Sequence, residues 1–257
     1  MLKSFGKFGY IYLGLIFLGF GIIALALSII CNTSILAFIG LGLTLWGGLF
    51  LFVRPVRYVQ ADLLDSTAIS SLLAIDKILT ELNCQGKGIH LPPRRLEEFK
   101  EGVVFVPMKE KILLPQTKDV SQGKVYLKDG ICLTPSGQGL LTLYEKRLGK
   151  DLSKTDIDSL ETNLSKLLIE DLELFEDLEI DRHGERVHVK TRGSIHESLC
   201  SQVRKRTNIC SRLGCPICSS IACALAKVTG KAVIIERNEI STDGKTIETW
   251  YRLVEVN

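Results

Sequence analysis

The segment LGCPICSSIACALAK, residues 213–227, combines three closely spaced cysteines with a run of small and apolar side chains. Proline suits the first position of a helix, because its missing amide hydrogen is not needed there. The segment therefore predicts a helix from Pro216 to Val228. Cys215 lies near the N-cap of this helix, and Gly230 is its expected C-cap.

The cysteines of this helix have a packing interpretation and a redox interpretation. Cys218 falls on the same apolar side as Ile221, Ala222 and Leu225, where a thiol acts as a small hydrophobe with a raised pKa. The order Cys215-Pro216-Ile217-Cys218 at a helix start resembles the redox turn of glutaredoxin-like proteins, in which the helix dipole lowers a thiol pKa. Residues 210–214 do not read as the buried strand that such a turn should follow, so packing is favoured.

A metal site is a third interpretation of the same residues. Cys210, Cys215 and Cys218 are close in sequence, and Cys200 and His196 are not far away. Zinc sites normally pair one Cys-x-x-Cys with a second matching pair, which this sequence lacks. We therefore expect no metal, with Cys210, Cys215 and Cys218 as the alternative ligand set.

The chain on both sides of this helix predicts two β-hairpins. Leu178 and Ile180 alternate with acidic residues before a turn at 181–184, and a second alternating strand follows the turn. The second hairpin joins residues 232–238 and 246–255 through Asp243-Gly244. Helices are expected at 157–172 and 195–206. Residues 151–257 are thus predicted as an α+β domain with the order α, ββ, αα, ββ.

The C-terminal third resembles the vinyl-reductase-type domain of the wider TRAPP/heme-NO-binding-like group. The residues that carry the resemblance are the hairpin of Leu178, Ile180, Val187 and Val189, then Gly193-Ser194-Ile195, Gly214-Cys215-Pro216-Ile217-Cys218, Val233-Ile234-Ile235-Glu236 and Tyr251. Such domains are sensory or adaptor modules with an apolar pocket between small-residue helices and a sheet. The resemblance implies that Cys215, Cys218 and Glu236 line or flank that pocket, and Ala222 on the small-residue helix joins them as a ligand-binding candidate. This chain departs from the pattern because residues 237–256 contain no cysteine.

Residues 58–150 are predicted as a membrane-proximal helix, 61–82, followed by a strand-rich region among Gly and Pro residues. The short apolar runs that suggest strands are 103–106, 112–114, 124–127 and 131–133. Residues 134–139, before a helical stretch at 140–148, are compatible with a phosphate cradle or with a turn and N-cap. The Lys-Ser/Thr ending of a P-loop is missing, so the turn is favoured.

No catalytic constellation is present. His90, His183 and His188 are expected to be solvated, and the sequence contains no Ser-His-Asp set, paired carboxylate cleft or His-Glu-x-x-His motif. The alternative catalytic residues are Cys215 and Cys218, with Cys218 as the resolving thiol. The sequence identifies no cofactor.

The N-terminal region predicts a transmembrane hairpin over residues 1–57. No Asp, Glu, Lys, Arg or His occurs between Phe8 and Val53, and two apolar runs, 9–31 and 35–53, flank a short polar turn. Each run has about the 20 residues that a membrane-spanning helix needs. Basic residues flank both outer ends (Lys3, Lys7, Arg54 and Arg57), so both termini are expected in the cytoplasm. The chain as a whole also resembles archaeal two-helix membrane proteins without an assigned activity.

Together these features predict a membrane-anchored cytoplasmic module that senses a small molecule or acts as a scaffold, without catalysis. A membrane-bound thiol oxidoreductase that uses Cys215 and Cys218 is the alternative. Since the cytoplasm is reducing, the eight cysteines are expected to be free thiols. The expected partners are the lipid bilayer, an apolar small molecule, and a second copy or another protein. The net charge of +3 does not suggest nucleic-acid binding.

Overall fold

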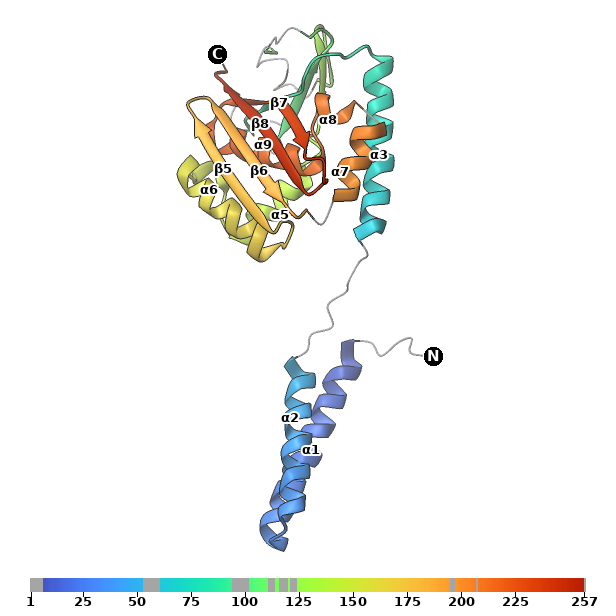
Figure 1. Cartoon of the computed structure of the whole chain (residues 1–257), viewed down its shortest axis with the longest axis vertical. Helices are drawn as coiled ribbons and strands as arrows, with labels where there is room; N and C mark the ends of the chain where they lie inside the picture. The colour runs from blue at the N-terminus through green and yellow to red at the C-terminus, as the bar shows by residue number, and fades with distance from the viewer. Residues whose placement is uncertain are drawn as a thin grey trace. The chain divides into compact units, whose positions relative to one another are not determined.

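The computed structural model describes residues 7–52, 61–93, 102–110, 114–115, 120, 124–194, 197–206 and 208–256. The chain divides into two compact units, residues 1–59 and 60–257 (Figure 1). Each unit is described by itself below.

The first unit is a pair of helices, α1 (Lys7–Cys31) and α2 (Ser34–Phe52), joined by a short turn at Asn32 (Figure 1). Both are long and apolar enough to cross a membrane, which confirms the predicted pair of apolar helices. Glycines allow the two helices to approach closely. A Cβ at Gly47 would lie 2.6 Å from the backbone nitrogen of Leu18, and a Cβ at Gly21 would lie 2.7 Å from that of Thr44.

The second unit is built on one sheet with the strand order β3-β4-β2-β1-β7-β8-β6-β5, in which neighbouring strands are antiparallel. The strands are β1 (Ile89–Leu91), β2 (Val103–Pro107), β3 (Tyr126–Leu127), β4 (Gly130–Leu133), β5 (Asp177–His183), β6 (Arg186–Arg192), β7 (Ala232–Ile240) and β8 (Thr246–Val254). The predicted α+β class is confirmed. Strands from both sides of residue 150 belong to this sheet, so the predicted boundary there does not coincide with a break in it.

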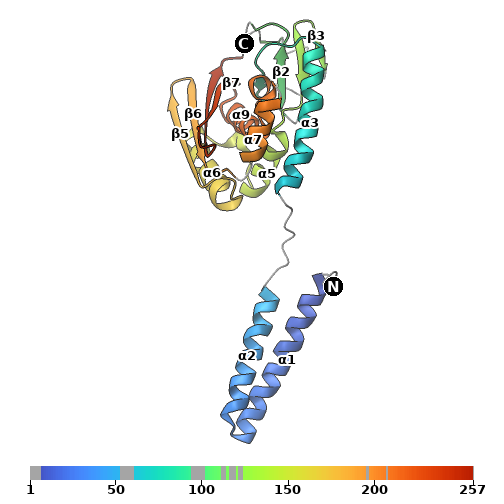
Figure 2. The same cartoon turned by 45° about the vertical axis from the view of Figure 1, so that its right-hand side comes forward.

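Helices cover one face of the sheet and its flank (Figure 2). They are α3 (Ala61–Glu81), α5 (Gln138–Leu148), the 3-10 turn Leu152–Lys154, α6 (Ile157–Ser165), the π-helix Lys166–Asp171, α7 (Glu197–Arg206), α8 (Ile209–Arg212) and α9 (Pro216–Thr229). The C-terminal order therefore matches the predicted α, ββ, αα, ββ, with the four-residue α8 added before α9.

Helix α9 is the central helix of the second unit, with eleven of its fourteen residues buried. Cys215 is its N-cap, and Gly230, at φ 67°, is its left-handed C-cap, as the sequence predicts. The segment Ile209–Thr229 is also long and apolar enough to cross a membrane, but 78% of it is buried inside the unit. Its apolar character is thus used in the protein core.

Residues 134–139 pack closely against α9, and this packing explains their role as a turn. Gly137 is the N-cap residue of α5, and a Cβ there would lie 2.0 Å from the backbone nitrogen of Ser220. The Tyr144 hydroxyl lies 2.8 Å from the Ser220 hydroxyl. The segment is therefore a turn packed against α9, and the turn interpretation holds over the phosphate cradle.

Two expectations, the position of the first hairpin turn and the exposure of His90, differ from the structure. The turn of the β5–β6 hairpin lies at Gly184 and Glu185, because β5 continues to His183. The predicted start of the helix at 157 agrees with α6, whose N-cap is Asp156; its carboxylate accepts a hydrogen bond from the Ser159 amide at 2.6 Å. Residues 112–113 of the predicted run 112–114 lie outside the described residues.

His90 is the second correction. The sequence predicts a solvated side chain, but His90 is 1% exposed on β1, between β2 and β7. Its Nε2 lies 3.1 Å from the Ser219 hydroxyl on α9. Because β1 is a central strand of the sheet, other parts of the protein surround the His90 side chain.

Candidate functional site

Three thiols meet at the N-terminus of α9. The sulfur of Cys215 lies 3.7 Å from that of Cys200 on α7 and 3.5 Å from that of Cys218 on α9. Their exposed fractions are 5% for Cys200, 2% for Cys215 and 4% for Cys218. Cys210 on α8 is half-buried nearby, and all eight cysteines of the chain are free thiols. We call Cys200, Cys210, Cys215 and Cys218 the thiol cluster.

Hydrogen bonding makes Cys215 the most acidic thiol of the cluster. Its bonds with the Cys200 and Cys218 thiols, supported by backbone amides of the first turn of α9, hold its pKa well below the ordinary value. The same bonds, together with burial, raise the pKa of Cys200 and of Cys218 well above the ordinary value. Negative charge in the cluster therefore concentrates on Cys215.

Asn238 on β7 connects the cluster to the sheet. Its side-chain amide nitrogen lies 3.0 Å from the Cys218 sulfur and 2.9 Å from the Thr249 hydroxyl oxygen. The hydroxyl of Tyr251, on the same strand as Thr249, donates to the Cys218 carbonyl at 3.1 Å. These contacts hold the first turn of α9 on strands β7 and β8.

A polar cavity of about 300 Å³ adjoins the thiol cluster. It is lined by Lys87, Arg204, Asn208, Cys210, Ser211, Ile235, Glu236, Arg237 and Asn238. This volume is at the lower end of the range of small-molecule sites, roughly 300 to 1,000 Å³. Cys210 and Asn238 belong both to the cavity wall and to the surroundings of the thiols.

A bulge in β7 helps to explain why four consecutive residues, 235–238, line this cavity. In a regular strand, neighbouring side chains point to opposite faces. The pairing of β7 with β8 shifts register between Ile235 and Arg237, which leaves Glu236 as the extra residue. Glu236, Arg237 and Asn238 can therefore all face the same hollow.

The sequence-predicted site residues are only partly brought together. Glu236 and Cys210 line the cavity, whereas Cys215, Cys218 and Ala222 are buried in α9 and are not among its lining residues. Ala222 is 0% exposed. The cavity is also polar, while the pocket implied by the resemblance is apolar.

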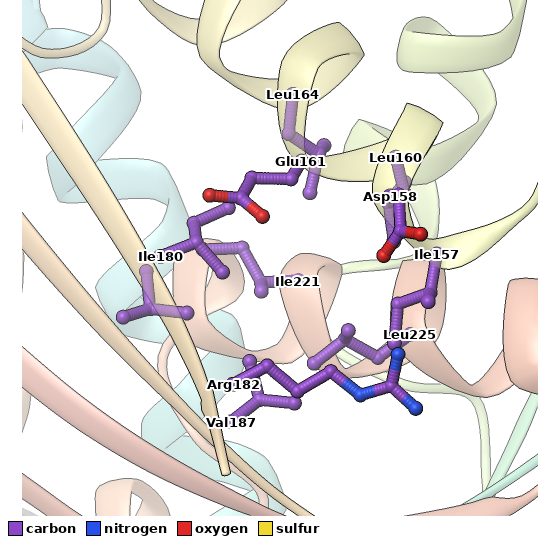
Figure 3. A pocket seen from close by; sticks show the side chains of 11 residues that line it. Ile157, Asp158, Leu160, Glu161, Leu164, Ile180, Arg182, Val187, Ile221 and Leu225 are labelled. Atoms are coloured by element: carbon purple, nitrogen blue, oxygen red, sulfur yellow. The ribbon is translucent and has the colours of Figure 1, made fainter. Parts of the chain in front are cut away.

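An apolar cavity does exist beside α9, but it is small. It has a volume of about 40 Å³ and lies between α6, the β5–β6 hairpin and the residues Ile221 and Leu225 of α9 (Figure 3). Figure 3 shows the charged ends of Asp158, Glu161 and Arg182 around these apolar side chains. This space suits one or two water molecules and is far below the size of a ligand site.

The alternative metal site is not formed by the predicted residues. No group of three or more His, Cys, Asp or Glu side chains among the described residues is arranged to hold a metal ion. Cys210, Cys215 and Cys218 are all described and form no such group. His196 lies outside the described residues.

Sequence reasoning missed Lys87, Arg204 and Asn238. None of these three residues is a candidate site residue in the sequence analysis. These residues come from α7, β7 and the loop before β1, which are far apart in sequence. The basic helix end at 203–206 was the available signal, but it did not indicate what the arginine would face.

One comparison with known proteins gives a match. A family model with the description "Domain of unknown function (DUF7982)" matches residues 9–251, which spans both compact units. No curated protein and no solved structure matches the chain.

Proposed function

Since the chain belongs to the DUF7982 family, whose description names no activity, we propose from its own residues that it is a membrane-anchored small-molecule-sensing module without catalytic activity. The observation that carries this proposal is the cavity of about 300 Å³, whose wall contains Cys210 of the thiol cluster and Asn238, which donates a hydrogen bond to Cys218. A ligand in the cavity would contact groups that hold the first turn of the central helix. Such contacts are a direct means of transmitting occupancy to the core.

The anchor supports the location of the sensor. Helices α1 and α2 meet the length and composition of membrane spans, and basic residues flank the pair on both outer sides. We therefore place both termini and the second unit in the cytoplasm. The resemblance to vinyl-reductase-type domains points to the same class of function, with a polar cavity in place of an apolar one.

Native mass spectrometry of the full chain released from detergent tests the sensing function. The wild-type chain is expected to carry an additional small-molecule mass. Ser211→Trp, which fills the cavity, should lose this mass, and Ser70→Trp, at an exposed position on α3, should keep it. A wild-type chain without any bound mass, and with no shift in melting temperature on addition of a cell metabolite extract, would contradict the sensing function.

A thiol oxidoreductase is the second candidate, favoured by the lowered pKa of Cys215 and its contacts with two other thiols. In such a reaction the Cys215 thiolate attacks a substrate disulfide and releases one thiolate. The Cys218 thiol gives its proton to the released thiolate and attacks the Cys215 sulfur of the mixed disulfide, which releases the second substrate thiolate and leaves a Cys215–Cys218 disulfide. Cys215 is only 2% exposed, which is why we prefer the sensing function.

The pH dependence of Cys215 alkylation separates the two candidates. Mass spectrometry of the full chain after iodoacetamide pulses gives the fraction of Cys215 that is modified at each pH. An apparent pKa below about 7 with reaction on the native protein supports the enzyme. A midpoint near 8.5 or above, or reaction only after unfolding, contradicts it.

A further inference from the structure

We propose that the polar cavity binds a small molecule bearing an oxyanion, a phosphate or a carboxylate, through Lys87 and Arg204. This inference rests on the proposed sensing function and names the ligand class of its site. It changes the expected ligand from an apolar molecule to an anionic one.

The charges of the cavity wall are the first support. Three basic residues and one acidic residue line it. The acidic one, Glu236, is neutralised by Arg252 at 3.0 Å and Arg186 at 3.5 Å, and neither arginine lines the cavity. Positive charge is therefore in excess on the wall.

The partners of the three basic residues show where that excess lies. Arg237 is occupied by Glu239 at 2.6 Å and lies 5.1 Å from the ring centre of Trp250. Lys87 donates to the Glu236 carbonyl at 2.5 Å, and Arg204 donates to the carbonyl and side-chain oxygens of Asn238. These oxygens are uncharged. Within the described part of the chain, no carboxylate pairs with Lys87 or Arg204.

An oxyanion would supply a charged hydrogen-bond acceptor to both Lys87 and Arg204. A guanidinium has five N–H donors in a planar fork that matches carboxylate and phosphate, and an ammonium has three. The contacts with Asn238 and Glu236 leave donors of each group available on the cavity side. Asn208 and Ser211, which also line the cavity, add polar groups around the same space.

The ligand would also be linked to the thiol cluster. Arg204 binds the oxygen of the Asn238 side chain whose nitrogen donates to Cys218, and the Arg204 charge lowers the pKa of Cys210 against the effect of burial. An anion at Arg204 weakens the effect of the Arg204 charge on Cys210. Occupancy should therefore slow alkylation of Cys210.

Isothermal titration of the full chain in nanodiscs of phosphatidylcholine tests the proposal. The probes are inorganic phosphate and citrate, each against chloride at matched ionic strength, because unspecific attraction is screened by salt. At least one probe should bind saturably. Arg204→Gln and Lys87→Gln should each weaken that binding about tenfold or more, as expected for a lost charged hydrogen bond.

Two variants control this experiment. Lys190→Gln removes a lysine that pairs with Glu179 and does not line the cavity, so it should bind as the wild type does. Arg204→Lys keeps the charge and should retain part of the affinity. If Arg204→Gln proves unstable by circular dichroism, Lys87→Gln and the Cys210 alkylation rate decide the result.

Discs containing phosphatidylglycerol distinguish the two sources of a phosphate. Competition between this lipid and soluble phosphate in the wild type, but not in Arg204→Gln, identifies a lipid headgroup. Unchanged phosphate affinity identifies a soluble molecule. Both results support the oxyanion site.

Other outcomes overturn it. Equal binding in the wild type, Arg204→Gln and Lys87→Gln, or no binding of either probe beyond chloride, contradicts the inference. A neutral molecule found by native mass spectrometry together with no anion binding refutes the ligand class but keeps the sensing function. If neither native mass spectrometry nor titration detects a bound molecule, both the ligand class and the sensing function are refuted.

Discussion

Two buried ionisable groups beside α9, His90 and Cys215, owe their pKa values to different causes. Burial lowers the pKa of His90 to about 4, because a charged imidazole loses its hydration there. Hydrogen bonds from neighbouring thiols lower the pKa of Cys215 in spite of burial. The lowered pKa of His90 affects the stability of the fold, and the lowered pKa of Cys215 affects the reactivity of its thiol.

The low pKa of His90 predicts a loss of stability in mild acid. Its folded value of about 4 lies below the unfolded value near 6.5, so the unfolded state takes up the proton first as the pH falls. The contribution is complete above about pH 6.5 and declines between pH 6.5 and 4 by roughly 3 kcal/mol in total. Denaturant unfolding of the full chain in detergent, followed at pH 7.5, 6, 5 and 4.5, measures it.

A His90→Gln variant is the control, since glutamine can still bond to Ser219 but does not titrate in this range. Its free energy of unfolding should change less between pH 7.5 and 4.5 than that of the wild type. Identical pH profiles for both proteins would show that His90 is not the group responsible.

At the scale of elements, α9 is surrounded because its small residues let other elements approach its backbone. Ser219 and Ser220 are both 0% exposed, and Gly137 of α5 meets the backbone of this turn directly. Pro216, the apolar run after it and Gly230 predicted the helix and both of its caps. It did not show that α5, with Gly137 at its start, would cross α9 at these serines.

The contact of α5 with α9 predicts different effects for two nearby glycines. Gly137→Ala places a Cβ 2.0 Å from the Ser220 nitrogen, and this overpacking should destabilise the chain by about 2 kcal/mol or more. Gly139→Ala, in the first turn of α5, meets nothing within 4 Å and should be neutral or stabilise by up to about 1 kcal/mol. Urea unfolding of both variants tests the difference. Equal stabilities would refute the close contact.

The helix pair of the first unit offers a similar comparison. Gly47→Leu must displace the Leu18 backbone, whereas Gly48→Leu has open space around its Cβ. The first change should separate α1 from α2 and the second should leave them packed. Disulfide cross-linking of cysteine pairs placed on α1 and α2 reports their distance. Equal cross-linking in both variants contradicts the packing.

At the scale of the whole molecule, an apolar helix pair and a mixed-charge unit are joined in one chain. Both segments with membrane-like composition near the N-terminus are exposed on most of their surface, while the third, Ile209–Thr229, is largely buried. Hydropathy alone does not distinguish an exposed apolar helix from one buried in the protein core. The charged residues around the third segment, and its burial under the sheet, make this distinction.

The proposed orientation predicts the behaviour of reporter fusions. Because the flanking basic residues favour the cytoplasm, alkaline phosphatase fused after Thr33 should be active, and the same enzyme fused after residue 257 should be inactive. Green fluorescent protein at the C-terminus should be fluorescent. Active phosphatase at the C-terminus would place the thiols outside and require their interpretation as disulfide partners.

Local patterns were sufficient to predict the apolar helix pair, helix α9 with its caps and the C-terminal hairpins, because caps and periodicity act over a few neighbouring residues. Only the tertiary structure shows three other features: the contact of Cys200 with Cys215, the burial of His90, and the cavity lined by both Lys87 and Arg204. These features depend on the order of strands in the sheet and on how α7 and α9 pack beside it. Contacts between distant elements leave no periodic pattern in one sequence.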